Sequence, residues 1–186
     1  MHASDRRRIA ATMLIIKSGT TASTVLSEYE RVLMARVAEG NLGICSVRLA
    51  LCPAVVLLIL SADQGRDLSE QAALDCYLIN APGQKAAITG FVLFLNKKYS
   101  KNLMIRLDEQ RARESRKSRL EKNLIGLLSA STLDEAFKKN WFSISLASFH
   151  GLPHSVVRQL ESEGIASQDS EGFSITWRGK AYWIPH

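Results

Sequence analysis

The segment from Cys45 to Leu60 most constrains how this chain folds, because it is apolar nearly all round. A helix without a polar face is stable only when other elements surround it. The longest apolar run within it, Leu49–Leu60, is shorter than the ~20 residues that span a bilayer, and it contains Pro53. We therefore expect a buried central helix that is kinked or restarted at Pro53, in a protein without a transmembrane segment.

Helical patterns flank this segment on both sides. Thr21–Ala38 and Lys85–Tyr99 each place apolar residues at a spacing of three and four, and Ser69 is suited to cap a helix between them. Together with the central segment, these patterns predict four short helices within residues 20–105.

The formal net charge of +6 over 186 residues is distributed unevenly. Residues 97–122 hold ten basic and four acidic side chains, and residues 1–19 hold four basic and one acidic. Such clusters are typical of proteins that bind a phosphate backbone. A solvated helix with internal salt bridges explains the central cluster equally well, because Glu114 and Glu121 alternate with cations at helical spacing.

The segment Asp108–Ser129 predicts one long helix whose two halves differ. The first half is highly polar, whereas the second half carries leucines that must pack on something: Leu120, Leu124, Leu127 and Leu128. We expect a basic N-terminal arm (1–19), a helical domain (20–105), a basic connector helix (106–130) and a second domain (131–186), with the boundary near residues 105–118.

Residues 131–186 show a helix, short helix, turn, helix and hairpin in that order. The signals are a capping box at Thr132–Glu135, a short helix at Ser145–Phe149, Pro153 opening a helix over His154–Glu163, and two strands around the turn 169–172. This order resembles a winged helix-turn-helix. We expect the last aromatic residues, Trp177, Tyr182 and Trp183, to pack in the core of this small domain.

The winged-helix resemblance implies that the helix after Pro153 enters the DNA major groove. Its groove-facing side would then present His154, Ser155, Arg158 and Gln159, with Arg158 suited to guanine and Gln159 to adenine. The expected wing tip carries Asp169 and Glu171, which repel phosphate. Winged helices also serve in dimerisation and partner docking, so both interpretations remain open.

The first domain has a resemblance of its own. Thr24–Arg36, Ser46–Leu60, Leu68–Leu78 and Gly83–Asn96 are similar to the helical core-binding domain of tyrosine recombinases of the phage-integrase type. The most specific phrase is a basic residue entering a helix that ends Phe-x-x-Phe-Leu-Asn.

This resemblance implies a mainly α fold with a four-helix, SAM-like domain that forms half of a clamp around DNA. The positions that would face DNA are Arg48, Lys85, Thr89, Lys97, Lys98 and Lys101. The basic connector adds Arg111, Arg113, Arg116, Lys117 and Arg119. The alternative for each is a solvated surface charge, and for Arg48 a partly buried ion pair.

The catalytic pattern of the recombinase family is missing. That family uses two arginines, a His-x-x-Arg box, a lysine and a C-terminal tyrosine, on a domain larger than residues 131–186 allow. His154 and Arg158 are spaced one residue too far apart, and no arginine pair accompanies Tyr182. We therefore expect DNA binding without strand cleavage and without catalytic residues; a degenerate recombinase acting through Tyr182 is a lesser hypothesis.

Other chemistry finds little support in the sequence. There is no Gly-rich phosphate loop, and His150 and His154 lie across a turn without nearby Cys or carboxylate ligands, so we expect no metal and no cofactor. Cys45 and Cys52 are expected to be packing residues of the buried central helix. Three cysteines without a C-x-x-C pair favour a reducing, cytoplasmic setting.

These observations predict a non-catalytic DNA-binding protein, an accessory or regulatory factor of a mobile element that acts in recombination or transcription. The expected partner is double-stranded DNA, with a homodimer or a partner recombinase as further partners, and with no membrane or small-molecule substrate. It would be nucleoid-associated in bacteria or encoded by a phage or plasmid. The alternative is a protein-interaction adaptor whose winged helix mediates dimerisation or partner docking.

Overall fold

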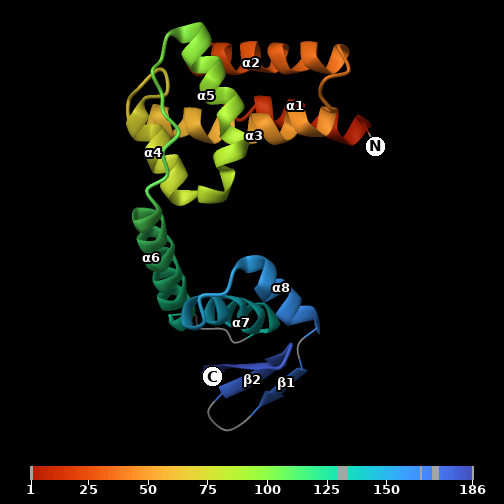
Figure 1. Cartoon of the computed structure of the whole chain (residues 1–186), viewed down its shortest axis with the longest axis vertical. Coiled ribbons are helices and arrows are strands. Elements are labelled where there is room, and N and C mark those ends of the chain that lie inside the picture. Colours follow the sequence, from red (N-terminus) through yellow and green to blue (C-terminus); the bar gives the residue numbers. More distant parts are fainter. Residues whose placement is uncertain (1, 130–133, 164, 169–171, 186) are drawn as a thin grey trace. The chain divides into compact units, whose positions relative to one another are not determined.

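A computed structural model describes residues 2–129, 134–163, 165–168 and 172–185 (Figure 1). These residues form a mainly helical fold with eight α-helices and a small antiparallel sheet near the C-terminus. The chain divides into two compact units, Met1–Ala112 and Arg113–His186. The division lies inside the range 105–118 that the sequence indicates, within one long helix.

The N-terminal unit is organised around α3, as the apolar composition of this segment indicates. Four other helices contact α3 directly (Figure 1). The helices are α1 (His2–Met13), α2 (Thr21–Ala38), α3 (Ile44–Asp63), α4 (Gln71–Asn80) and α5 (Lys85–Tyr99), with a 3-10 turn, η1 (Pro82–Gln84), before α5. Pro53 is buried in the middle of α3, which continues through it as one helix. The side chains of Val47, Leu51, Leu57 and Leu58 are fully buried in the core.

Two details of this unit differ from the expectation. Residues 2–13 form α1 instead of a separate arm, because Ile9 and Ile16 are buried in the same core as α3. The arginines of α1 remain exposed. Ser69 does not cap α4, which begins after Glu70; the Ser69 hydroxyl is buried and accepts a hydrogen bond from the Ser61 hydroxyl (3.0 Å).

The outer side of α3 is exposed, so Cys45 and Cys52 are not packing residues as expected. Half of α3 is buried, and within the described residues it is the single unbroken helix long and apolar enough to cross a membrane. The core helix of a soluble protein meets the same criterion.

The C-terminal unit contains three helices and three strands. Its elements are α6 (Glu109–Leu128, whose first residues belong to the N-terminal unit), α7 (Glu135–Phe149), α8 (His154–Glu163), β1 (Ile165–Gln168), β2 (Gly172–Trp177) and β3 (Lys180–Pro185). The strands form an antiparallel sheet in the order β1-β2-β3, in which Ser174 lies opposite both Ser167 and Trp183. Leu146, Val157, Leu160, Ile175 and Ile184 make the core.

Several expectations for this unit need correction. α7 is one continuous helix, not a capping-box helix followed by a short one, and Asp134 caps it by accepting from the Phe137 N–H (2.7 Å). The expected cap, Thr132, lies outside the described residues. The strand β3 was not expected. It forms because Lys180–Pro185 pairs along β2.

The burial of the apolar residues in this unit also differs from the expectation. Trp183 is exposed (45%), although Trp177 and Tyr182 pack against the core. The Trp141 indole donates instead to the carbonyl of Pro185 (2.7 Å), which ties α7 to β3. On α6, Leu128 is exposed, whereas Leu120, Leu124 and Leu127 are half-buried.

Candidate nucleic-acid interface

Helix α8 has one buried and one exposed side. Pro153 precedes it, and the Pro153 carbonyl accepts from the N–H groups of both Val156 and Val157 (3.0 Å each). Val157 and Leu160 are buried in the core of the unit. The residues expected to face DNA are all exposed: His154, Ser155, Arg158 and Gln159. The structure therefore places these four side chains on one accessible helix surface.

A side chain of the basic helix reaches the turn before α8. The guanidinium of Arg116 donates a hydrogen bond from Nη2 to the carbonyl of Leu152 (2.9 Å). Arg116, Arg119 and His154 line one hollow of about 270 Å³ where α6, α7 and α8 meet. Two arginines of α6 are thus gathered beside the first turn of α8, a helix end that itself favours anions.

A second hollow, of about 480 Å³, lies between α7 and α8. Lys138, Lys139 and Arg158 line it together with the carboxylates of Glu135 and Glu161. Lys138 is engaged by Glu135 (Nζ to Oε1, 2.7 Å). The sequence interpretation missed these lysines, although the Lys-Lys pair on the expected helix was a usable signal. The mixed charges make this surface weaker for phosphate than the Arg116 hollow.

The turn from β2 to β3 forms a basic tip. Arg178 and Gly179 both have positive φ (50° and 75°), which is the conformation of a two-residue type I′ hairpin turn. The Arg178 guanidinium lies over the Trp177 ring, 4.3 Å from its centroid, and Lys180 follows. The sequence interpretation placed the wing tip at 169–172, of which 169–171 lie outside the described residues. The Arg-Gly pair between two strand patterns could have indicated this tip.

The remaining basic residues of α6 are exposed and partly engaged along the helix. Arg111 pairs with Asp108 (Nε to Oδ2, 3.5 Å) and Lys117 with Glu121 (Nζ to Oε1, 3.9 Å). Arg113 and Arg119 are exposed as well. Surface pairs of this kind contribute about 0–1 kcal/mol and break readily when a phosphate competes. Both interpretations of the basic helix therefore remain compatible with its contacts.

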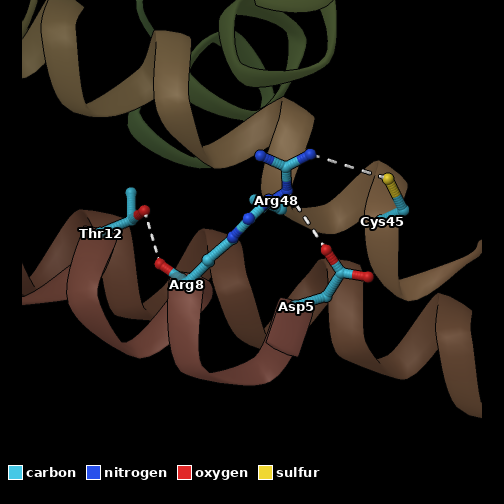
Figure 2. A network of polar contacts seen from close by, with 5 residues as sticks. All are labelled: Asp5, Arg8, Thr12, Cys45 and Arg48. Carbon is cyan, nitrogen blue, oxygen red and sulfur yellow. Dashed lines mark hydrogen bonds and ion pairs between the residues drawn. The ribbon is translucent and has the colours of Figure 1, made fainter. Parts of the chain in front are cut away.

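In the N-terminal unit, Arg48 is engaged in the way that the alternative described. Its Nε lies 3.4 Å from Oδ1 of Asp5, and its side chain is 27% exposed. Figure 2 shows this pair, together with the Arg48 donation to Cys45 Sγ (3.9 Å) and the Thr12 hydroxyl donating to the Arg8 carbonyl (2.8 Å). Arg48 thus joins α3 to α1, which favours a structural role over a contact with DNA.

The candidates on α5 have different surroundings. Lys98 pairs with Glu28 (Nζ to Oε1, 2.8 Å), and the Tyr99 hydroxyl donates to the same carboxylate. Hydrogen bonds from Lys98 and Tyr99 lower the pKa of Glu28, and burial followed by the Glu28 contact raises the pKa of Tyr99 to about 12. Thr89 donates to the Lys85 carbonyl (2.8 Å).

The α5 candidates do not form one cluster. Lys97 and Lys98 line a hollow of about 580 Å³ with Arg36, an exposed residue that the sequence interpretation missed. Lys85 is exposed near the opposite end of α5, about 18 Å along the helix from Lys97. Lys101 is half-buried beyond α5. Among the described residues, no group of His, Cys, Asp or Glu could hold a metal ion.

Comparison with known proteins adds no relative. No protein-family model matches the chain, and no curated protein or solved structure matches it. The residues and their arrangement therefore carry the functional argument alone.

Proposed function

We propose that this protein binds double-stranded DNA through its C-terminal unit, which acts as a winged helix-turn-helix, and that it does not catalyse strand cleavage. The observation that carries the proposal is the exposed side of α8, where His154, Ser155, Arg158 and Gln159 lie opposite the buried Val157 and Leu160. These side chains have the length and the donor groups that read base edges in a major groove. The turn before α8 and the sheet after it follow the order of elements in that motif.

Two basic features support backbone contacts beside α8. The hollow lined by Arg116, Arg119 and His154 offers cations next to the first turn of the helix. Arg178 and Lys180 place two more cations at the β2–β3 turn, where a wing would meet the phosphates. Phosphate contacts fix the position of a protein on DNA, and base contacts select the sequence.

The proposed biological role is that of an accessory or regulatory factor of a mobile element, with a recombinase as a further partner. Its support is the likeness of the N-terminal segments to a recombinase core-binding domain. Lys85, Lys97 and Arg36 are exposed there and suited to additional phosphate contacts. Two weak modules on one chain would bind DNA more tightly than either alone, because the second contact is intramolecular.

A salt titration tests the proposal. Binding of the whole chain to a fluorescent random duplex is followed by anisotropy at increasing salt. If six to eight phosphates are engaged, the log–log slope lies between about −5 and −7. The triple variant His154→Ala, Arg158→Ala, Gln159→Ala should weaken binding at least tenfold, whereas Arg66→Ala, an exposed residue paired with Glu70, should not. A slope near zero, or equal effects of the two variants, would contradict the proposal.

A second candidate function is a protein-interaction adaptor. The observation that favours it is the pair of exposed aromatic side chains Phe149 (55%) and Trp183 (45%), next to the His150 ring that contacts the Trp183 carbonyl (2.7 Å). Exposed aromatics are common at protein interfaces. The double variant Phe149→Ser, Trp183→Ser removes both aromatic side chains. If this variant still binds DNA, the DNA-binding function is favoured over the adaptor.

A further inference from the structure

The outer side of α3 carries a continuous apolar surface. Leu49 (55%), Val56 (46%) and Ile59 (37%) are exposed; the exposed Cys45 precedes them along the helix, and the exposed Cys52 lies between Leu49 and Val56. We call these five residues the α3 stripe. The opposite side of α3 is fully occupied by the core of the unit, so the stripe is surplus to the packing of this unit.

The spacing of the stripe is that of a helix–helix interface. Its members follow one another at intervals of four, three, four and three residues, from position 45 to position 59. This alternation keeps side chains on one seam and lets a second helix pack at a small crossing angle. Scattered surface hydrophobics need no explanation, but a seam over four helical turns does.

The two ends of the stripe carry opposite charge. Near the start of α3 lie Arg8 and Arg48; Arg48 pairs with the carboxylate of Asp5, and Figure 2 shows the side chain of Arg8 extending toward Arg48. The other end has exposed Asp63 and Asp67.

Other charged residues near the two ends of the stripe do not cancel this difference in charge. Arg6 and Arg7 add to the basic end. At the acidic end, Arg66 pairs with Glu70 (Nε to Oε2, 3.4 Å), and Lys17 lies near Asp67 in the same hollow. The acidic end thus has three carboxylates and two cations, against four cations and one carboxylate at the basic end.

We propose that a second copy of this chain covers the α3 stripe, with the two α3 helices antiparallel and Cys52 at the two-fold axis. An antiparallel arrangement lays the basic end of each copy over the acidic end of the other, whereas a parallel one would place like charges together. A two-fold interface needs a self-complementary patch, and a charge-asymmetric seam centred on Cys52 meets that condition. An anionic membrane would attract one end and repel the other.

This dimer does not depend on the DNA-binding function. If both exist, the dimer presents two α8 helices and suits a palindromic site. If DNA binding fails, the α3 interface stands on its own.

Light scattering on the whole chain is the first experiment. The wild type should have the mass of a dimer, and the double variant Leu49→Glu, Val56→Glu should be a monomer with an unchanged circular dichroism spectrum, because both residues are exposed in one copy. The matched control is Val32→Glu, Leu93→Glu, which changes two residues of α2 and α5 that are at least as exposed as Val56, and it should stay dimeric. A monomeric wild type, or a dimer that survives the α3 variant, would overturn the proposal.

Cross-linking tests the orientation. A chain that keeps only Cys52 (Cys45→Ser, Cys76→Ser) should be joined to its copy by a short bismaleimide. A chain that keeps only Cys45 should not, because two Cys45 residues would lie about 21 Å apart along antiparallel helices. Cross-linking of both chains would indicate parallel helices and refute the antiparallel arrangement. Flotation of monomeric protein with phosphatidylglycerol vesicles that is lost in the Leu49→Glu, Val56→Glu variant would show instead that lipid occupies the stripe.

Discussion

The guanidinium of Arg116 donates a hydrogen bond to the backbone carbonyl of Leu152 across 2.9 Å. Arg116 belongs to the basic helix α6, and Leu152 lies in the turn that precedes α8. The contact therefore links the most basic segment of the chain to the helix proposed to read DNA. One side chain serves two purposes here, since it holds the turn and also contributes positive charge to the hollow beside it.

Replacing Arg116 by methionine should lower both the stability of the C-terminal unit and the affinity of the protein for DNA. Loss of a charged donor to a backbone carbonyl should lower the free energy of unfolding by about 1 kcal/mol. All three tryptophans lie in the C-terminal unit, so urea unfolding followed by tryptophan fluorescence reports on this unit. DNA affinity should fall more than for the control Lys117→Met, whose side chain pairs with Glu121 on the same helix. Equal effects of the two variants on affinity would argue against the role of the Arg116 contact.

Arg158 and Lys180 should differ in what they contribute to DNA binding. Arg158 lies on the exposed side of α8, so Arg158→Ala should relax sequence preference at one position and cost about 1–3 kcal/mol there. Lys180 lies at the β2–β3 turn, so Lys180→Ala should weaken binding to all sequences alike and make the salt slope about one unit shallower. Selection of preferred sites from a random library, followed by anisotropy on the selected duplex, separates the two outcomes.

The helices of this protein were predictable where local signals agree with burial. Thr21–Ala38, Lys85–Tyr99 and His154–Glu163 have the bounds that their spacing, glycines and prolines indicate. The α1 helix was missed because its arginines dominated the interpretation of residues 1–19. Only the tertiary contact with α3 gives Ile9 and Ile16 a place in the core.

The candidate sites were less predictable from the sequence than the helices. The residues of α8 that would face DNA were predicted from the winged-helix resemblance, together with the apolar spacing that places Val157 and Leu160 on the other side of the helix. The pairing of Arg48 with Asp5, separated by more than forty positions, depends on how α1 and α3 pack, and the sequence could offer it only as an alternative. The exposure of Cys45 and Cys52 was likewise hidden, because a helix apolar all round gives no sign of which side lacks a neighbour.

We expect Arg178 to strengthen DNA binding while its strained backbone lowers the free energy of unfolding. A positive φ is strained for arginine and tolerated by asparagine, so Arg178→Asn should relieve about 1 kcal/mol of strain. Loss of the contact with the Trp177 ring offsets about half of that gain. We expect an unchanged or slightly higher urea midpoint, together with weaker DNA binding. The control Arg178→Gly relieves the same strain; if it bound DNA as tightly as the wild type, the charge at this tip would have no role in binding.

Glu28 should make the N-terminal unit sensitive to acid. Its pKa is lowered by hydrogen bonds from Lys98 and Tyr99, from an ordinary value of 4.5. A carboxylate with a lowered pKa in the folded state contributes stability above its unfolded pKa and loses it as the pH falls through the folded pKa. Glu28→Gln should therefore lower the melting temperature at neutral pH and have less effect below the folded pKa. Circular dichroism melts across this range test the prediction, with Glu30→Gln on the same helix as the control. A melting difference between wild type and Glu28→Gln that stays constant from neutral to acid pH would contradict it.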